Sequence, residues 1–174
     1  MKTLLLSAAV AVMTVTSCST VQSIVQNAFP YTTNVLVASG TPANQEISSV
    51  SAATSIAQFA GATNNQVKDV RISNAKISVV SPTGQSLGMF RSVKVYISGN
   101  NTGEVLVASR QDIGDNVGTQ INLDPDTSRV LDNYVINQNV KVRLAYVLKE
   151  RSTVDTNLKV SLGFTSTPVS PVGQ

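Results

Sequence analysis

Two stretches near the end of the chain decide the fold: VKVRLAYVL at residues 140–148 and LKVSLGF at residues 158–164. Apolar side chains occupy every second position in both, with basic residues at several of the positions between. Successive side chains of a strand point to opposite faces, so each stretch predicts a strand with one face in a core and one in water. We expect a turn near residues 151–153 to join them into an antiparallel hairpin.

Similar strand patterns recur along the preceding residues. Residues 33–38 form the first, and residues 67–80 form a long one whose apolar phase slips at Ser73-Asn74, which predicts a bulge or a bend. Apolar alternation at residues 93–97 and 105–107 flanks a Gly- and Asn-rich stretch, which predicts another hairpin. Ile121 and Leu123 indicate a further short strand.

Two segments have helical spacing instead. Residues 47–60 are rich in Ala and Ser, have apolar residues at helical offsets, and end at Gly61, where a glycine after a helix would stand. Asp124-Pro125 is typical of a helix start, with an apolar stripe following at Val130, Leu131, Tyr134 and Val135. Asp124, Asp126 and Ser128 also resemble the start of a calcium loop, but the positions that need Gly and Glu hold Arg129 and Val135, so helix capping is favoured.

The composition supports a β protein. The 174 residues include 26 Val, 9 Ile and 17 Thr, which are β-branched residues that suit pleated strands. We therefore expect an all-β fold: an antiparallel β-sandwich, immunoglobulin-like or jelly-roll-like, of roughly seven or eight strands with one or two short helices. The chain contains no His, which excludes Ser-His-Asp and Cys-His catalysis and removes the commonest transition-metal ligand. No cofactor or metal site is expected.

The first eighteen residues suggest an anchor. Lys2 precedes an apolar run over residues 4–13, which is too short to span a bilayer and fits a signal peptide. The run leads to Val15-Thr16-Ser17-Cys18, which contains the only Cys in the chain. This box resembles the lipobox of bacterial lipoproteins, and the resemblance implies cleavage before Cys18 and lipidation of its thiol. In layout the chain also resembles small Bacteroidota envelope lipoproteins, with the subfamily left open.

The resemblance also implies a location. Ser19 follows the Cys, which by the enterobacterial sorting rule indicates the outer membrane. An acidic run that would favour surface display is missing after Cys18, so the periplasmic face is favoured. We expect a signal peptide over residues 1–17, a lipidated tether over residues 18–30, a β-sandwich domain over residues 31–164 and a disordered tail over residues 165–174.

One charge pattern stands out on the expected strands. Several basic residues fall on outward positions, and they would form a basic face if their strands are neighbours: Lys94, Lys141, Arg143, Lys149 and Lys159. The simpler interpretation is that these residues keep the wet faces of the strands soluble and block edge pairing.

The sequence favours a non-catalytic binding or structural module of the bacterial cell envelope. Its partner would be an envelope protein or a polymer, and nucleic acid is not expected. The net charge of +3 falls close to zero once the leader with Lys2 is removed. Two alternatives remain open: a lipid-binding sandwich with an apolar pocket, and a hydrolase or accessory enzyme that uses carboxylates alone. Converging carboxylates would favour the enzyme, and an open apolar cavity would favour the lipid carrier.

Overall fold

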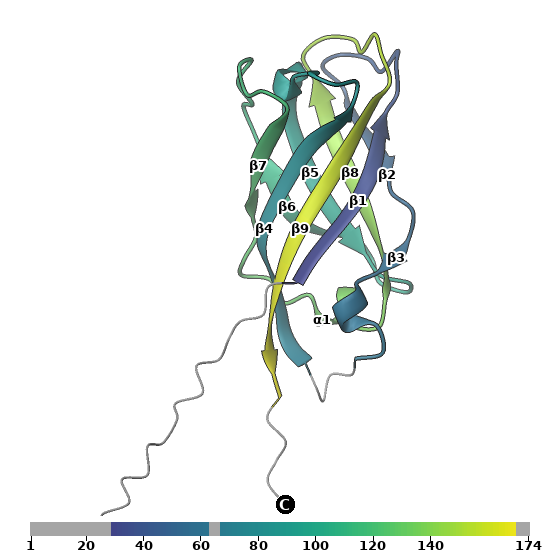
Figure 1. Ribbon diagram of the computed structural model, residues 1–174, viewed down its shortest axis with the longest axis vertical. Helices are drawn as coiled ribbons and strands as arrows, with labels where there is room; N and C mark the ends of the chain where they lie inside the picture. Colours follow the sequence, from purple (N-terminus) through teal and green to yellow (C-terminus); the bar gives the residue numbers. More distant parts are fainter. Residues whose placement is uncertain (1–28, 63–66, 170–174) are drawn as a thin grey trace, which may run out of the picture.

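The computed structural model describes residues 29–62 and 67–169, whose strands form a two-layered, nearly closed β-sandwich (Figure 1). All the strand pairings are antiparallel, which confirms the expected fold class. The strands are β1 (Phe29–Val37), β2 (Glu46–Val50), β3 (Thr54–Ser55), β4 (Val67–Ser81), β5 (Phe90–Ser98), β6 (Val105–Arg110), β7 (Gln120–Pro125), β8 (Asn139–Leu148) and β9 (Thr156–Pro168). Their hydrogen-bonded order is β1-β9-β4-β7-β6-β5-β8-β2, and β3 also pairs with β8.

The two stretches that indicate the fold lie in different layers. β9 lies between β1 and β4, whereas β8 pairs with β5 on one side and with β2 and β3 on the other. The hairpin predicted between them is therefore wrong. Both edges of each strand are already occupied by other strands, and residues 149–155 cross from one layer to the other instead of forming a tight turn.

Other strand predictions are confirmed. β5 and β6 form the expected hairpin, with Val93 opposite Arg110 and Ile97 opposite Val105. The register between β4 and β9 shifts between Ile72 and Asn74, where the apolar phase slips in the sequence. The bulge turns the later half of β4 so that Ala75 and Ile77 stay buried.

The helix predicted over residues 47–60 is wrong. The segment forms β2, β3 and a 3-10 turn at Ala57–Phe59. β2 lies antiparallel to β8, with Ile47 opposite Tyr146, and this pairing overrides a weak helical pattern. Ile56 and Phe59 are each 1% exposed, so the turn serves to close one end of the core.

The second predicted helix is displaced and shortened. Asp124 and Pro125 are the last residues of β7, and the helix α1 is a single turn at Asp132–Val135. Its position is set by Asp132, whose carboxylate accepts hydrogen bonds from the backbone N–H groups of Val70 (2.7 Å) and Asp69 (3.1 Å). Val130, expected on the buried stripe, is 42% exposed.

The sandwich extends beyond the predicted domain limits at both ends. β1 begins at Phe29, within the segment predicted as a tether, and β9 continues to Pro168, within the predicted tail. Thr165 and Thr167 pair with the first half of β4, opposite Arg71 and Lys68. The β-branched threonines suit this added ladder.

One hydrophobic core fills the space between the layers. It takes inward side chains from both, with Val142 and Leu144 of β8 and Leu158 and Val160 of β9 fully buried. The layers are also linked at the open seam beside β1. The Tyr31 hydroxyl donates to the carbonyl of Val140 (3.1 Å) and also hydrogen-bonds Thr54, and the Ser49 hydroxyl donates to the carbonyl of Leu36.

We predict that Gly88→Ala lowers the free energy of unfolding by about 1–3 kcal/mol, because the added Cβ overpacks a site that cannot yield. That Cβ would lie 2.1 Å from the backbone carbonyl oxygen of Asp115. Gly103→Ala is the matched control, because a Cβ there has no neighbour within 4 Å. Urea denaturation of both variants tests this, and equal stabilities would contradict it.

Candidate functional site

The predicted lipidation site, Cys18, lies outside the described residues, as does the rest of the lipobox. Within the described part of the chain, no helix is both long and apolar enough to cross a bilayer. The same part contains no cluster of three or more Cys, Asp or Glu side chains suited to a metal ion.

The five predicted basic residues do not share one face. Lys94 of β5 and Lys141 and Arg143 of β8 lie on the outer face of one layer, with Tyr96 opposite Arg143. Lys149 follows the end of β8, and Lys159 lies in β9 of the other layer. The structure thus brings together three of the five.

Carboxylates from neighbouring segments neutralise most of these charges. Lys94 binds Glu46 at 2.8 Å, and Lys149 binds Asp115. The Glu46 hydrogen bond and charge raise the pKa of Lys94. The hydrogen bond from Lys149 lowers the pKa of Asp115. On the outer face of the β5–β8 layer, Lys94 and Arg143 are therefore paired with carboxylates, whereas Lys141 has no ion pair among the described residues.

Arg143 has the most elaborate surroundings on that face. Its Nε and Nη2 atoms donate to both oxygens of Glu104 at 2.7–2.9 Å, and its guanidinium lies 4.1 Å from the centre of the Tyr96 ring. The bidentate hydrogen bonds are the main cause of the lowered pKa of Glu104 and of the raised pKa of Arg143. The geometry fixes Arg143 in one orientation, with its Nε and Nη2 atoms bound to Glu104.

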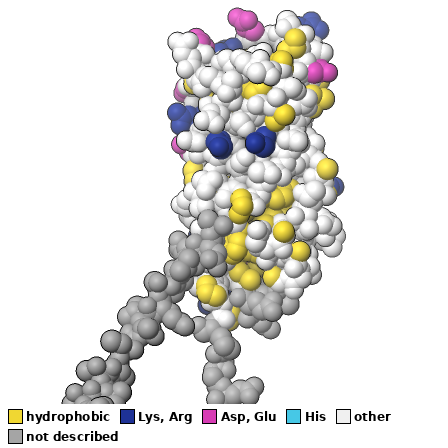
Figure 2. All heavy atoms as spheres, viewed as in Figure 1, with side chains coloured by type: hydrophobic (Ala, Val, Ile, Leu, Met, Phe, Trp, Pro, Cys, Tyr) yellow, Lys and Arg dark blue, Asp and Glu magenta, His cyan; other side chains and the backbone are white. Residues whose placement is uncertain are grey.

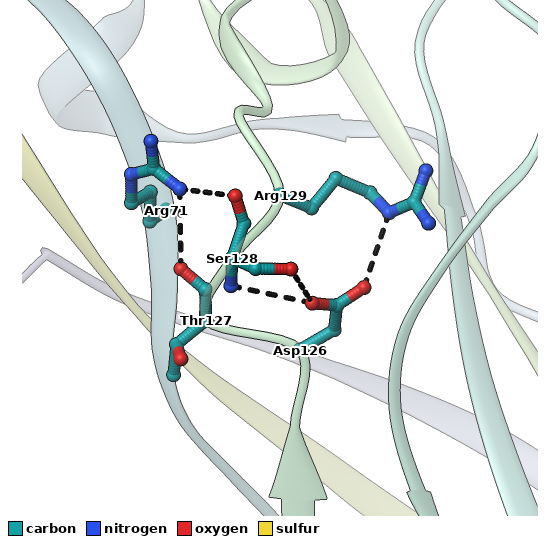
Figure 3. Close-up of polar contacts among 5 residues, drawn as sticks. All are labelled: Arg71, Asp126, Thr127, Ser128 and Arg129. Atoms are coloured by element: carbon teal, nitrogen blue, oxygen red, sulfur yellow. Dashed lines mark hydrogen bonds and ion pairs between the residues drawn. The ribbon is translucent and has the colours of Figure 1, made fainter.

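Two of the three residues considered for calcium, Asp126 and Ser128, lie in the loop after β7 (Figure 3), and Asp124 lies within β7. Asp126 accepts hydrogen bonds from the Ser128 hydroxyl (2.6 Å) and backbone N–H (3.2 Å), and from Arg129 (3.2 Å). The Ser128 hydrogen bond and then Arg129 lower the pKa of Asp126. Arg71, which lies in β4, donates hydrogen bonds to the backbone carbonyls of Thr127 and Ser128. Asp124 forms an ion pair with Arg110 instead. Asp124 and Asp126 thus have different partners, and the loop is held by its own side chains together with Arg71 of β4.

A different surface forms on the outer face of the β1–β9–β4–β7 layer. Two rows of residues cross all four strands in register, and we call them together the polar platform. The first row is Thr32, Ser161, Lys76 and Asn122, and the second is Asn34, Lys159, Ser78 and Gln120. Each row contains one lysine and three neutral side chains that form hydrogen bonds.

The lower part of the platform is hollowed. A depression of about 640 Å³ lies over the first row and the adjoining residues Pro30, Asn74 and Gly163. The side chain of Asn74 packs directly over Gly163. A Cβ on Gly163 would lie 2.3 Å from the side-chain nitrogen of Asn74, so this packing requires glycine. Figure 2 shows two basic patches near the middle of this side of the molecule, with hydrophobic surface below them.

Sequence reasoning missed most of the platform. Apolar alternation predicts an outward position for Lys159, but it does not indicate that Lys76 lies beside it. The outward Ser, Thr and Asn residues between the apolar positions were a usable signal, because they alternate with buried residues in each strand. Their assembly into rows depends on a register that joins Thr32 to Ser161.

The comparisons with known proteins do not assign this chain to a family. No protein-family model matches it, and no curated protein matches it significantly. Among solved structures, a chain described as Desmodium yellow mottle tymovirus aligns over 99% of both chains, with 11% identity and a TM-score of 0.29. A likeness at that level carries no argument about function.

We predict that Glu104→Gln lowers the free energy of unfolding by about 0.5–1 kcal/mol at neutral pH, the range of a surface pair, since Arg143 and Glu104 are 24% and 44% exposed. Arg143 depresses the pKa of Glu104 in the folded state, so the pair stabilises the fold above the ordinary carboxyl pKa, and this contribution is lost as pH falls through the depressed value.

Denaturation of both proteins across pH tests this prediction. The difference between wild type and Glu104→Gln should shrink below about pH 4 and also at high salt. Glu150→Gln is the control, because Glu150 forms no ion pair within the residues described. A difference that persists unchanged in acid would contradict the prediction.

Proposed function

We propose that this protein is a lipid-anchored lipoprotein of the bacterial outer membrane whose β-sandwich is a non-catalytic binding or structural module. The observation that carries the proposal is the Val15-Thr16-Ser17-Cys18 box with its unique Cys, followed after a short segment by a sandwich. Attached acyl chains would hold the protein at the membrane, because two or three chains give stable anchoring.

The strand arrangement gives the module an orientation relative to this anchor. Cys18 and Phe29 are separated by roughly 40 Å at most, even with the intervening chain fully extended. β1 begins at the same end of the sandwich as β4, and β9 ends there (Figure 1). We therefore place that end toward the bilayer. The loops at residues 38–45 and 149–155 then point away from it, and the polar platform lies on the side.

The packing of the module favours binding at its surface. The inward faces of both layers form one continuous core, with residues such as Val95, Ile97 and Leu144 fully buried. An open depression of about 640 Å³ lies over the platform, and its lining combines polar side chains with apolar surface from residues such as Pro30 and Leu123. A ligand would therefore meet the outside of the sandwich and not its interior.

Lipidation is tested with Cys18→Ala, using Ser17→Ala as the control, because Ala also meets the need for a small residue before the cleavage site. Cells labelled with an alkyne fatty acid should incorporate the label into the wild type and the control but not into Cys18→Ala. Intact mass should show a chain that begins at an acylated Cys18. A wild-type chain that is cleaved without acyl label would contradict the anchor.

Location is tested by protease treatment of intact and permeabilised cells, followed by detection of the sandwich domain. We expect co-fractionation with the outer membrane and cleavage only after permeabilisation, because the acidic run that would favour surface display is missing after Cys18. A cytoplasmic protein serves as the lysis control. Cleavage on intact cells would place the module outside and overturn the periplasmic assignment.

A further inference from the structure

Basic residues are treated differently on the two faces of the sandwich. On the β5–β8 face, Lys94 and Arg143 are paired with Glu46 and Glu104, and of the three basic residues there only Lys141 has no ion pair within the described residues. On the polar platform, Lys76 and Lys159 have no carboxylate within ion-pair distance among the residues that the structure describes. The platform therefore presents positive charge that the protein itself does not neutralise.

These two lysines are close neighbours. Lys76 lies opposite Ser161 and Lys159 lies opposite Ser78 on the adjacent strand, so they occupy diagonal positions across β4 and β9. Diagonal neighbours on a sheet have Cα atoms about 7–8 Å apart. Two like charges at this spacing repel one another, and an anion placed between them would relieve that repulsion.

The remaining platform side chains are short, neutral and rich in donors and acceptors. Thr32, Ser161 and Asn122 share the row of Lys76, and Asn34, Ser78 and Gln120 share the row of Lys159. Hydroxyl and amide groups of this kind hydrogen-bond with hydroxyl groups of a ligand. The depression is wide and open, which suits an extended chain that lies across the strands.

We propose that the polar platform binds an acidic polysaccharide, with its carboxylates at Lys76 and Lys159 and its hydroxyls at the neutral side chains of the two rows. The inference deepens the proposed binding function and rests on it, because an envelope location presents such polymers to this face. The side chains along the two rows are hydroxyls, amides and lysines, and the depression adds apolar surface from residues such as Pro30 and Leu123.

The test measures binding of the purified full chain, kept in detergent, to polygalacturonate. The matched ligand is methyl-esterified polygalacturonate, which has the same backbone but blocked carboxylates. We expect the esterified polymer to bind at least about tenfold more weakly, and the double variant Lys76→Gln/Lys159→Gln to lose about tenfold in affinity for the acidic polymer. Raising the salt concentration should weaken wild-type binding.

The control variant removes the same charge elsewhere. Lys68→Gln/Lys141→Gln changes two exposed lysines that lie outside the platform, and it should keep affinity within about twofold of wild type. Asn122→Ala leaves the charge unchanged and should weaken binding through the lost amide contact. These surface changes leave the buried core unaltered.

Three results would overturn the inference: no binding to polygalacturonate, equal binding of the esterified polymer, or an equal loss in the two double variants. The last result would show that net charge and not the platform determines binding. None of these results bears on acylation of Cys18 or on location in the envelope, so the lipid anchor is tested separately by the experiments proposed for it.

Discussion

The structure depends on burying one face each of β8 and β9 in a common core. Val142 and Leu144 of β8 and Leu158 and Val160 of β9 are fully buried. The opposite layer covers these faces, and neighbouring strands on both edges help to exclude water from the sides. β8 therefore lies between β5 and β2, and β9 lies between β1 and β4. With both edges occupied, the two strands cannot pair, although they follow one another in the sequence.

Local patterns predicted strands better than partners. Alternation identified β8 and β9 and their buried faces, because the period of two belongs to the strand itself. The β5–β6 hairpin was predictable because a short Gly- and Asn-rich loop leaves little choice of partner. The longer connection after β8 permits either a hairpin or a crossing between layers, and adjacency in sequence favoured the wrong one. The helix prediction for residues 47–60 was wrong for a related reason, because the pairing of β2 with β8 outweighs the helical spacing of the apolar residues.

The candidate site shows the same division between local and distant information. Outward positions of Lys94, Arg143 and Lys159 followed from alternation. The ion pairs of Lys94 and Arg143 could not be predicted in this way, because their partners Glu46 and Glu104 come from segments distant in sequence. The polar platform likewise requires the register of four strands, which no single strand contains. Cys18 is the opposite case, because its prediction as a lipidation site depends only on the residues next to it in the sequence.

A count of basic residues is thus a poor guide to where a β-sandwich presents charge. The β5–β8 face has Lys94, Lys141 and Arg143, yet Glu46 and Glu104 neutralise two of them. The platform face has fewer basic residues in its rows, but their neighbours in register are hydroxyls and amides. Pairing with Glu104 fixes the side chain of Arg143 and offsets its charge. The platform lysines form no ion pair within the described residues, so their charge is available to an anionic ligand.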